Sequence, residues 1–239
     1  MTAAAVAAAL ALWAPSPGMT WQWQLSGRLD LSVPAQVYDV DLFDTPASTV
    51  AALHARGVRV VCYVDAGTLE PDRPDARRFP RAIVGARVSG WPRERWLDVR
   101  SRALRPLLER RMDACARKGF DAVEADNVDG YANRTGFPLT AADQLRFNRF
   151  LARAAHARGL SIALKNDLGQ AAALEPYFDW ALVEECFRYR ECASTAPFVR
   201  AGKAVLAVEY GRACPAGAPA GLTVMRKRRA LDAWRALCG

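Results

Sequence analysis

The sequence has only two histidines, His54 and His156, and both fall in segments whose apolar spacing predicts surface helices. A histidine-centred hydrolase or metal site is therefore disfavoured. The chain also lacks a Gly-x-Ser-x-Gly nucleophile elbow, a phosphate-binding loop and a Gly-x-Gly-x-x-Gly motif, so serine-hydrolase and nucleotide-dependent chemistry have no support. Carboxylate chemistry remains, either with a divalent cation or as an acid and nucleophile pair at a glycosidic bond.

Lysine is also scarce, and the only lysines are Lys118, Lys165, Lys203 and Lys227. The formal net charge is nevertheless +8, because arginines spread over the predicted helices supply most of the positive charge. One dense basic run, residues 226–229, lies at the end of the last predicted strand, and no aromatic residues alternate with its basic side chains. We interpret this charge as a solvated face and expect no nucleic-acid partner.

The chain has no apolar run long enough to span a bilayer as a helix, so we expect no membrane partner. Residues 3–13 are apolar and rich in alanine, with a small-x-small site at residues 9–11, although a basic n-region is missing. We interpret residues 1–19 as a signal peptide or a disordered N-terminal segment. Residues 20–239 show no composition break and predict one domain, in a protein that is secreted or extracytoplasmic.

Acidic residues gather where predicted strands end. The strongest case is residues 119–130, where an apolar strand runs into a cluster that includes Asp126 and Asp129. Other strand ends carry acids in the same way, namely Asp39, Asp41, Asp65, Glu184, Glu185 and Glu209. Because the carboxyl ends of parallel strands meet on one face, this recurrence predicts a single acidic cleft.

Helix-like stretches alternate with these strands, which is typical of a parallel α/β sheet. Strands are expected at residues 21–25 and 222–227, and in runs that end at Leu42, Gly67, Asp126, Lys165, Glu184 and Tyr210. Helices are expected over residues 45–56, 101–118, 140–158 and 231–237. Eight strands indicate a (β/α)8 TIM barrel in one domain. A doubly wound open sheet is the alternative, and residues 96–99 could form an additional strand.

The six cysteines lack the close pairs of a zinc site, which favours disulfides and an oxidising compartment. We expect Cys186 bonded to Cys192 in the loop after the sixth strand, Cys214 to Cys238 near the C-terminus, and the remaining Cys62 to Cys115. Buried free thiols are the alternative.

Taken in order, these segments resemble the successive signatures of glycoside hydrolase family 114, the endo-α-1,4-polygalactosaminidase-like TIM-barrel proteins. The similarity is collinear over residues 21–210 and is carried by residues 21–25, 37–45, 62–67, 96–98, 119–130, 164–167, 184–187, 191–192 and 208–210. The chain departs from the family at one motif, because the usual Asn-Glu-Gln-Cys-Phe is Val183-Glu184-Glu185-Cys186-Phe187 here.

The resemblance implies that residues 20–239 form a glycosidase domain that cuts α-1,4-linked galactosamine-containing polysaccharide. Its catalytic pair corresponds by position to Asp126 after the fourth strand and Glu184 after the sixth. By analogy with other α-glycosidase barrels, Asp126 would be the nucleophile and Glu184 the general acid/base of a retaining mechanism. The residues expected to line the pocket are Asp39, Asp41, Tyr63, Asp65, Asp129, Lys165, Asn166, Glu209 and Tyr210.

Several carboxylates in one cleft repel one another, and a bound ammonium group relieves that repulsion. We therefore expect a cationic amino-sugar polymer as the substrate. We also expect a monomeric enzyme that uses no cofactor and no metal. Three alternatives stay open: another α-linked sugar as substrate, a barrel that binds carbohydrate without cleaving it, and a divalent cation held by Asp126, Asn127 and Asp129.

Overall fold

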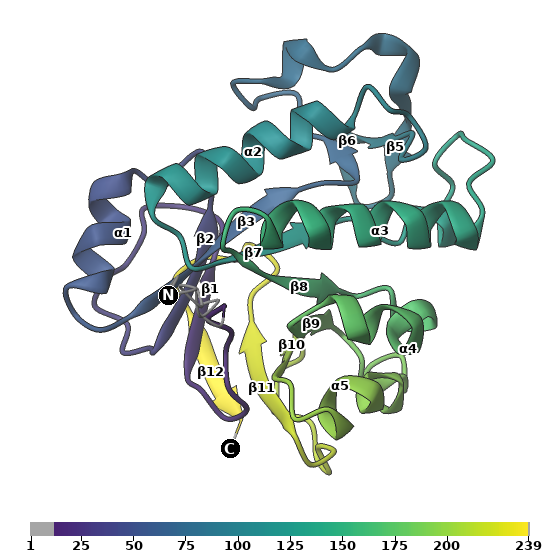
Figure 1. Cartoon of the computed structure of the whole chain (residues 1–239). Helices are drawn as coiled ribbons and strands as arrows, with labels where there is room; N and C mark the ends of the chain where they lie inside the picture. The colour runs from purple at the N-terminus through teal and green to yellow at the C-terminus, as the bar shows by residue number, and fades with distance from the viewer. Residues whose placement is uncertain (1–11, 239) are drawn as a thin grey trace, which may run out of the picture.

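The computed structural model describes residues 12–238 and has the form of an α/β barrel (Figure 1). Eight parallel strands follow one another around it in chain order. They are β1 (Trp21–Gln24), β2 (Val37–Asp41), β3 (Arg59–Asp65), β7 (Ala122–Asp126), β8 (Ser161–Lys165), β9 (Trp180–Glu184), β10 (Val205–Glu209) and β11 (Leu222–Lys227). The strand order never reverses, so the (β/α)8 barrel is confirmed and the doubly wound sheet is excluded.

The helix expected over residues 231–237 is wrong, because this segment ends in a strand. Strand β12 (Arg235–Cys238) pairs antiparallel with β11. Leu231 has a left-handed backbone, with φ of 51°, and the Asp232 carboxylate accepts a hydrogen bond from the Trp234 N–H at 3.0 Å. Both features form a turn that interrupts a helix. The helical spacing of these seven residues favours a helix only weakly. Pairing with β11 is favoured more strongly, because it satisfies backbone groups along the edge of β11 that would otherwise lack partners.

Contacts outside the strand ladder join β1 to the segment that precedes β12. The backbone N–H groups of Leu25 and Ser26 both donate to the Leu231 carbonyl, at 3.0 and 3.2 Å. The Gln22 side-chain amide donates to the Ala233 carbonyl at 2.7 Å. These bonds bring the first and last strands together and complete the wall of the barrel.

The chain before β1 lies against side chains that fill the barrel. Trp13, Ala14 and Met19 pack on the interior apolar cluster, and the Arg59 guanidinium lies over the Trp13 ring at 5.6 Å. Most of the expected export segment, residues 1–11, lies outside the described residues. The domain boundary at residue 20 stays a prediction.

Three of the expected helices are present, and they cover one side of the barrel (Figure 1). The α-helices are α1 (Ala47–His54), α2 (Arg105–Lys118), α3 (Ala141–His156), α4 (Ala171–Leu174) and α5 (Ala196–Arg200). Short 3₁₀ helices are η1 (Ala76–Arg78), η2 (Arg81–Ile83), η3 (Gly130–Ala132), η4 (Leu168–Gln170), η5 (Glu175–Tyr177) and η6 (Cys192–Thr195). Within residues 12–238, no helix combines the length and apolar character needed to cross a bilayer.

A small antiparallel sheet is inserted between β3 and α2, above the barrel mouth. Its strands are β4 (Thr68–Leu69), β5 (Val84–Val88) and β6 (Trp91–Leu97), in the order β4-β6-β5. The extra strand suggested at residues 96–99 is therefore the end of β6, in this separate sheet. The insertion starts at Gly67, where an added Cβ would lie 1.7 Å from the Asn127 carbonyl oxygen. Only glycine permits that close approach of the loops after β3 and β7.

Apolar side chains fill both faces of the barrel sheet because alternate residues of a strand point to opposite faces. Inside the barrel, Trp21, Trp180 and Met225 belong to one buried cluster. Outside, Val60 and Val123 belong to a second cluster that packs against the helices. The lower part of the interior is thus closed by apolar groups, and the polar interior residues lie toward the C-terminal mouth.

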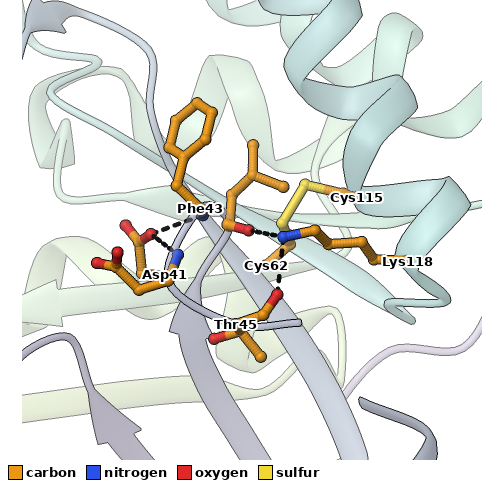
Figure 2. The surroundings of a disulfide bond; sticks show 8 residues. Asp41, Phe43, Thr45, Cys62, Cys115 and Lys118 are labelled. Carbon is orange, nitrogen blue, oxygen red and sulfur yellow. Dashed lines mark hydrogen bonds between the residues drawn. A yellow bond between two sulfur atoms is a disulfide. The ribbon is translucent and has the colours of Figure 1, made fainter. Parts of the chain in front are cut away.

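All three expected disulfides are present: Cys62–Cys115, Cys186–Cys192 and Cys214–Cys238. The first joins β3 to α2, as Figure 2 shows. Beside it, the Lys118 ammonium donates to the carbonyls of Leu42 and Thr45 at 2.5 and 2.7 Å, which fixes the loop after β2 (Figure 2).

Candidate active site

The ends of three neighbouring strands, β7, β8 and β9, place a lysine between two carboxylates. Lys165, the last residue of β8, has its Nζ 3.1 Å from Asp126 Oδ1 and 3.2 Å from Glu184 Oε2. Because these two contacts add to 6.3 Å, the two oxygens lie no farther apart than that. The residues predicted as the catalytic pair, from β7 and β9, therefore face each other across the mouth.

Asp126 is held by three hydrogen bonds. Its Oδ2 accepts from the Tyr63 hydroxyl at 2.9 Å, and its Oδ1 accepts from the Asn127 N–H at 2.8 Å and from Lys165. Burial and the Asp126 charge raise the pKa of Tyr63 well above its usual value, so the phenol keeps the proton that it donates. The side chain of Asp126 is 19% exposed, which leaves it open to the cavity.

Glu184 is oriented from the two strands that flank β9. The Tyr210 hydroxyl donates to Glu184 Oε1, and the Asn166 amide donates to Glu184 Oε2 at 3.4 Å. The Asn166 amide oxygen in turn accepts the backbone N–H of Glu184 at 2.9 Å. Burial and the Glu184 charge raise the pKa of Tyr210, so it also remains a donor. Glu184 is 25% exposed.

A cavity of about 690 Å³ opens over this pair. Five of the residues predicted to line the pocket do so, namely Tyr63, Asp129, Lys165, Asn166 and Tyr210. The other four lie outside its wall: Asp39 is buried below, Asp41 pairs with Arg73, Asp65 accepts from Thr68, and Glu209 accepts the Phe187 N–H. A substrate contact for these four stays a prediction.

Negative charge is crowded around the cavity. Burial, together with neighbouring carboxylates, raises the pKa of Asp65 to about 7 and that of Glu94 to about 8. On the opposite side, burial raises the pKa of Asp129, and burial and Asp129 raise the pKa of Asp167 to about 8. Burial is the largest cause of each of these pKa shifts, and repulsion between neighbouring carboxylates adds to it.

Glu185, one of the two residues that depart from the family motif, forms an ion pair beside the cavity. It has a left-handed backbone, with φ of 54°, and its carboxylate accepts from Arg229 at 2.9 and 3.0 Å. The same guanidinium lies over the Tyr210 ring at 4.8 Å. The ion pair with Glu185 thus holds the Arg229 guanidinium over the ring of Tyr210, the residue whose hydroxyl donates to Glu184. Val183, the other departure, is fully buried in the outer cluster.

The sequence did not single out several residues of this site. Trp91 and Glu94 line the cavity from the inserted sheet, where no strand-end rule applies. The basic run at residues 226–229 is not uniformly solvated: Lys227 is buried, because strand alternation turns it into the barrel. Glu124 could have been found, since it lies two residues before Asp126 and so on the same face of β7.

The arrangement fits acid and nucleophile chemistry better than the divalent-cation alternative. Within residues 12–238, no three His, Cys, Asp or Glu side chains are placed to hold a metal ion. The ammonium of Lys165 already lies at hydrogen-bonding distance from Asp126. A cation ligated by Asp126 would be repelled by that charge.

Comparison with known proteins gives a consistent result. The model of glycoside-hydrolase family GH114 matches residues 2–239. The crystal structure of Aspergillus fumigatus Ega3 in complex with galactosamine is similar to this chain at 37% identity, covering 95% of this chain and 97% of the other, with a TM-score of 0.90. The glycoside hydrolase domain of PelA from Pseudomonas aeruginosa shares the fold at 15% identity, covering 92% and 98%, with a TM-score of 0.69. No curated protein sequence matches the chain.

Proposed function

Because the chain belongs to glycoside-hydrolase family GH114, we propose that it hydrolyses an α-1,4-linked galactosamine-containing polysaccharide with Asp126 and Glu184 as its catalytic pair. The observation that supports this pair is the shared contact with Lys165, which holds both carboxylates at one cavity. The galactosamine bound to the similar Ega3 supports an amino sugar as the substrate.

The proposed mechanism is retaining. Carboxyl groups about 5–5.5 Å apart are typical of retaining glycosidases, and about 6.5–9.5 Å of inverting ones. The upper limit of 6.3 Å between Asp126 Oδ1 and Glu184 Oε2 favours the shorter range. Asp126 attacks the anomeric carbon while protonated Glu184 gives its proton to the leaving oxygen. Water then enters, Glu184 takes one of its protons, and the glycosyl ester on Asp126 is cleaved.

A cationic substrate fits the charge around the cavity. Glu70, Glu94 and Asp129 line it together with the catalytic pair. Burial raises the pKa of Glu94 and of Asp129, and repulsion from neighbouring carboxylates raises both further. The ammonium group of a deacetylated sugar would relieve that repulsion. Trp91 is 56% exposed at the cavity rim, where its ring is free to stack on a sugar face.

An extracytoplasmic location for a monomer completes the proposal. The three disulfides close loops that a reducing cytosol would open. The acidic cavity is built from one chain, so the proposed reaction needs no second copy.

The test is incubation with acetylated and deacetylated α-1,4-galactosaminans, with an α-linked neutral glucan for comparison, followed by mass analysis of the products. We expect cleavage of the deacetylated polymer, weaker cleavage at high salt, and an α-anomeric product in early NMR spectra. Asp126→Asn is the inactive control. A β-anomeric first product would refute retention, and binding without cleavage of any polymer would refute the hydrolase.

A further inference from the structure

Two fully buried carboxylates lie beneath the catalytic pair. Glu124 of β7 is 0% exposed and Asp39 of β2 is 1% exposed. Glu124 accepts hydrogen bonds on both oxygens, from Lys165 Nζ on Oε1 at 2.9 Å and from the Trp23 indole N–H on Oε2 at 2.9 Å. A carboxylate with a charged donor on one oxygen and an N–H donor on the other is stabilised as an anion.

Asp39 has the opposite surroundings. Its two oxygens have no N–H or O–H donor among the described residues. The strand register places it between Trp23 of β1 and Val61 of β3, and both of those side chains belong to the apolar interior cluster. An ionised carboxylate without donors in such a place is strongly disfavoured, whereas a protonated one can use its own O–H.

We propose that Asp39 is a neutral carboxylic acid that donates its proton to Glu124, and that this buried pair holds Lys165 as a fixed cation between Asp126 and Glu184. Asp39 and Glu124 are positioning residues, because neither lines the cavity. The inference rests on the proposed function only for its catalytic consequence. The charge state of the buried pair is a property of the fold.

The surrounding charges are consistent with this assignment. Burial, the Glu124 charge, a side-chain hydrogen bond with Glu124 and the Asp126 charge raise the pKa of Asp39 well above its usual value, and only Lys165 opposes them. Glu124 has a raised pKa through burial and Asp126, but the direct contact with Lys165 works in the other direction. The proton therefore belongs on Asp39 and the negative charge on Glu124.

The catalytic consequence follows from how charge moves in a retaining reaction. Before the first step the negative charge is on Asp126, and after it the charge is on Glu184. Lys165 contacts both oxygens, so one immobile cation stabilises both states without moving. If Asp39 were also an anion, Lys165 would have to compensate three carboxylates at each stage, and its attraction for the catalytic pair would be offset.

Asp39→Asn and Glu124→Gln form the matched test, because each keeps the shape of the side chain. In Asp39→Asn the new side-chain amide would donate to Glu124 as the acid does, so kcat should stay within about threefold of wild type and the pH–rate profile should not move. Glu124→Gln removes a real negative charge, so the alkaline limb of the profile should move to lower pH by about half a unit or more, with kcat reduced about tenfold. Circular dichroism of both variants checks folding.

Infrared spectroscopy provides a measurement that needs no substrate. Other carboxyl groups with raised pKa values, such as Asp65 and Asp167, contribute protonated-acid bands to both proteins. The difference spectrum of wild type minus Asp39→Asn at neutral pH should therefore contain the carbonyl stretch of one further buried protonated acid, resistant to deuterium exchange. If Asp39→Asn shifts the alkaline limb as Glu124→Gln does, or if the difference spectrum contains no protonated-acid band, the proposal is overturned. Inactivity of the wild type on every galactosaminan would instead contradict the proposed function and leave the infrared test standing.

Discussion

The interior of the barrel contains two pairs of carboxylates at different depths. The upper pair, Asp126 and Glu184, is 19% and 25% exposed and faces a cavity. The lower pair, Asp39 and Glu124, is 1% and 0% exposed and lies outside the cavity wall. Among residues 12–238, Lys165 is the one residue that forms ion pairs with both layers. Burial depth and hydrogen-bond donors, not residue type, therefore distinguish the proposed catalytic pair above from the proposed positioning pair below.

Removing either member of the upper pair should give the largest loss of activity. Asp126→Asn and Glu184→Gln are each expected to lower kcat by about 10³-fold while the apolar barrel stays folded. An aryl glycoside of an α-1,4-galactosamine oligomer separates the roles, because its leaving group needs no proton. Burst kinetics should show rapid phenol release with Glu184→Gln and none with Asp126→Asn. Equal rates for the two variants would contradict the assignment.

The second-largest loss of activity is expected when Lys165, which pairs with both layers, is replaced. Lys165→Met leaves Glu124 buried without its counter-ion, which is expected to cost about 3–5 kcal/mol of unfolding free energy. It should also lower kcat by about 10²-fold, because both carboxylates of the proposed catalytic pair lose a fixed positive charge. Urea denaturation and steady-state kinetics measure the two effects.

Two further variants separate stability from catalysis at this lysine. Lys227→Met also removes a buried lysine, but its Nζ donates to the Asp232 carbonyl, outside the cavity. It should destabilise the fold with kcat unchanged. Lys165→Met combined with Glu124→Gln should regain part of the stability but not the activity. Recovery of activity in that double variant would show that Lys165 acts only on the lower layer.

The difference in depth could be predicted from sequence only in part. Acids at strand ends correctly indicated one acidic mouth, and Asp126 and Glu184 are the last residues of β7 and β9. Asp39 comes two residues before the end of β2, which places it one interior layer deeper than a strand-end residue. Counting from the strand end would have revealed this, as it would for Glu124.

Other parts of the site have no local signal. Trp91 and Glu94 reach the cavity through the inserted sheet, whose placement depends on packing of the loops at Gly67 and Asn127. β12 replaced a predicted helix because the exposed edge of β11 is a tertiary feature that helical periodicity cannot report.

A smaller effect is expected at the rim of the upper layer. Arg229→Ala removes the guanidinium from the Tyr210 ring and one of the two arginine partners of Glu185, which also pairs with Arg188. Because an exposed cation–π contact contributes about 0.5–1 kcal/mol, kcat should fall about two- to fivefold with KM little changed. Arg228→Ala is the neighbouring control, since Arg228 pairs with Asp232 instead. If Arg228→Ala lowers kcat as much as Arg229→Ala does, the contact of Arg229 with the Tyr210 ring does not position Tyr210.

The smallest effect on activity should come from Asp39→Asn, and this variant tests the lower layer through stability. The pKa of Asp39 is raised in the folded chain, so its contribution to stability is complete below about pH 3.9, the unfolded value, and decreases as pH rises above that. Asparagine does not ionise in the unfolded state and avoids this loss.

Asp39→Asn should therefore unfold at a higher temperature than wild type at pH 7, by about 2–4 °C for each kcal/mol. At pH 3.5 the advantage should shrink, because both unfolded chains are then largely neutral at this position. Calorimetry at the two pH values measures it. A lower Tm at pH 7 would mean that Asp39 is ionised in the fold and that the two layers do not differ in charge.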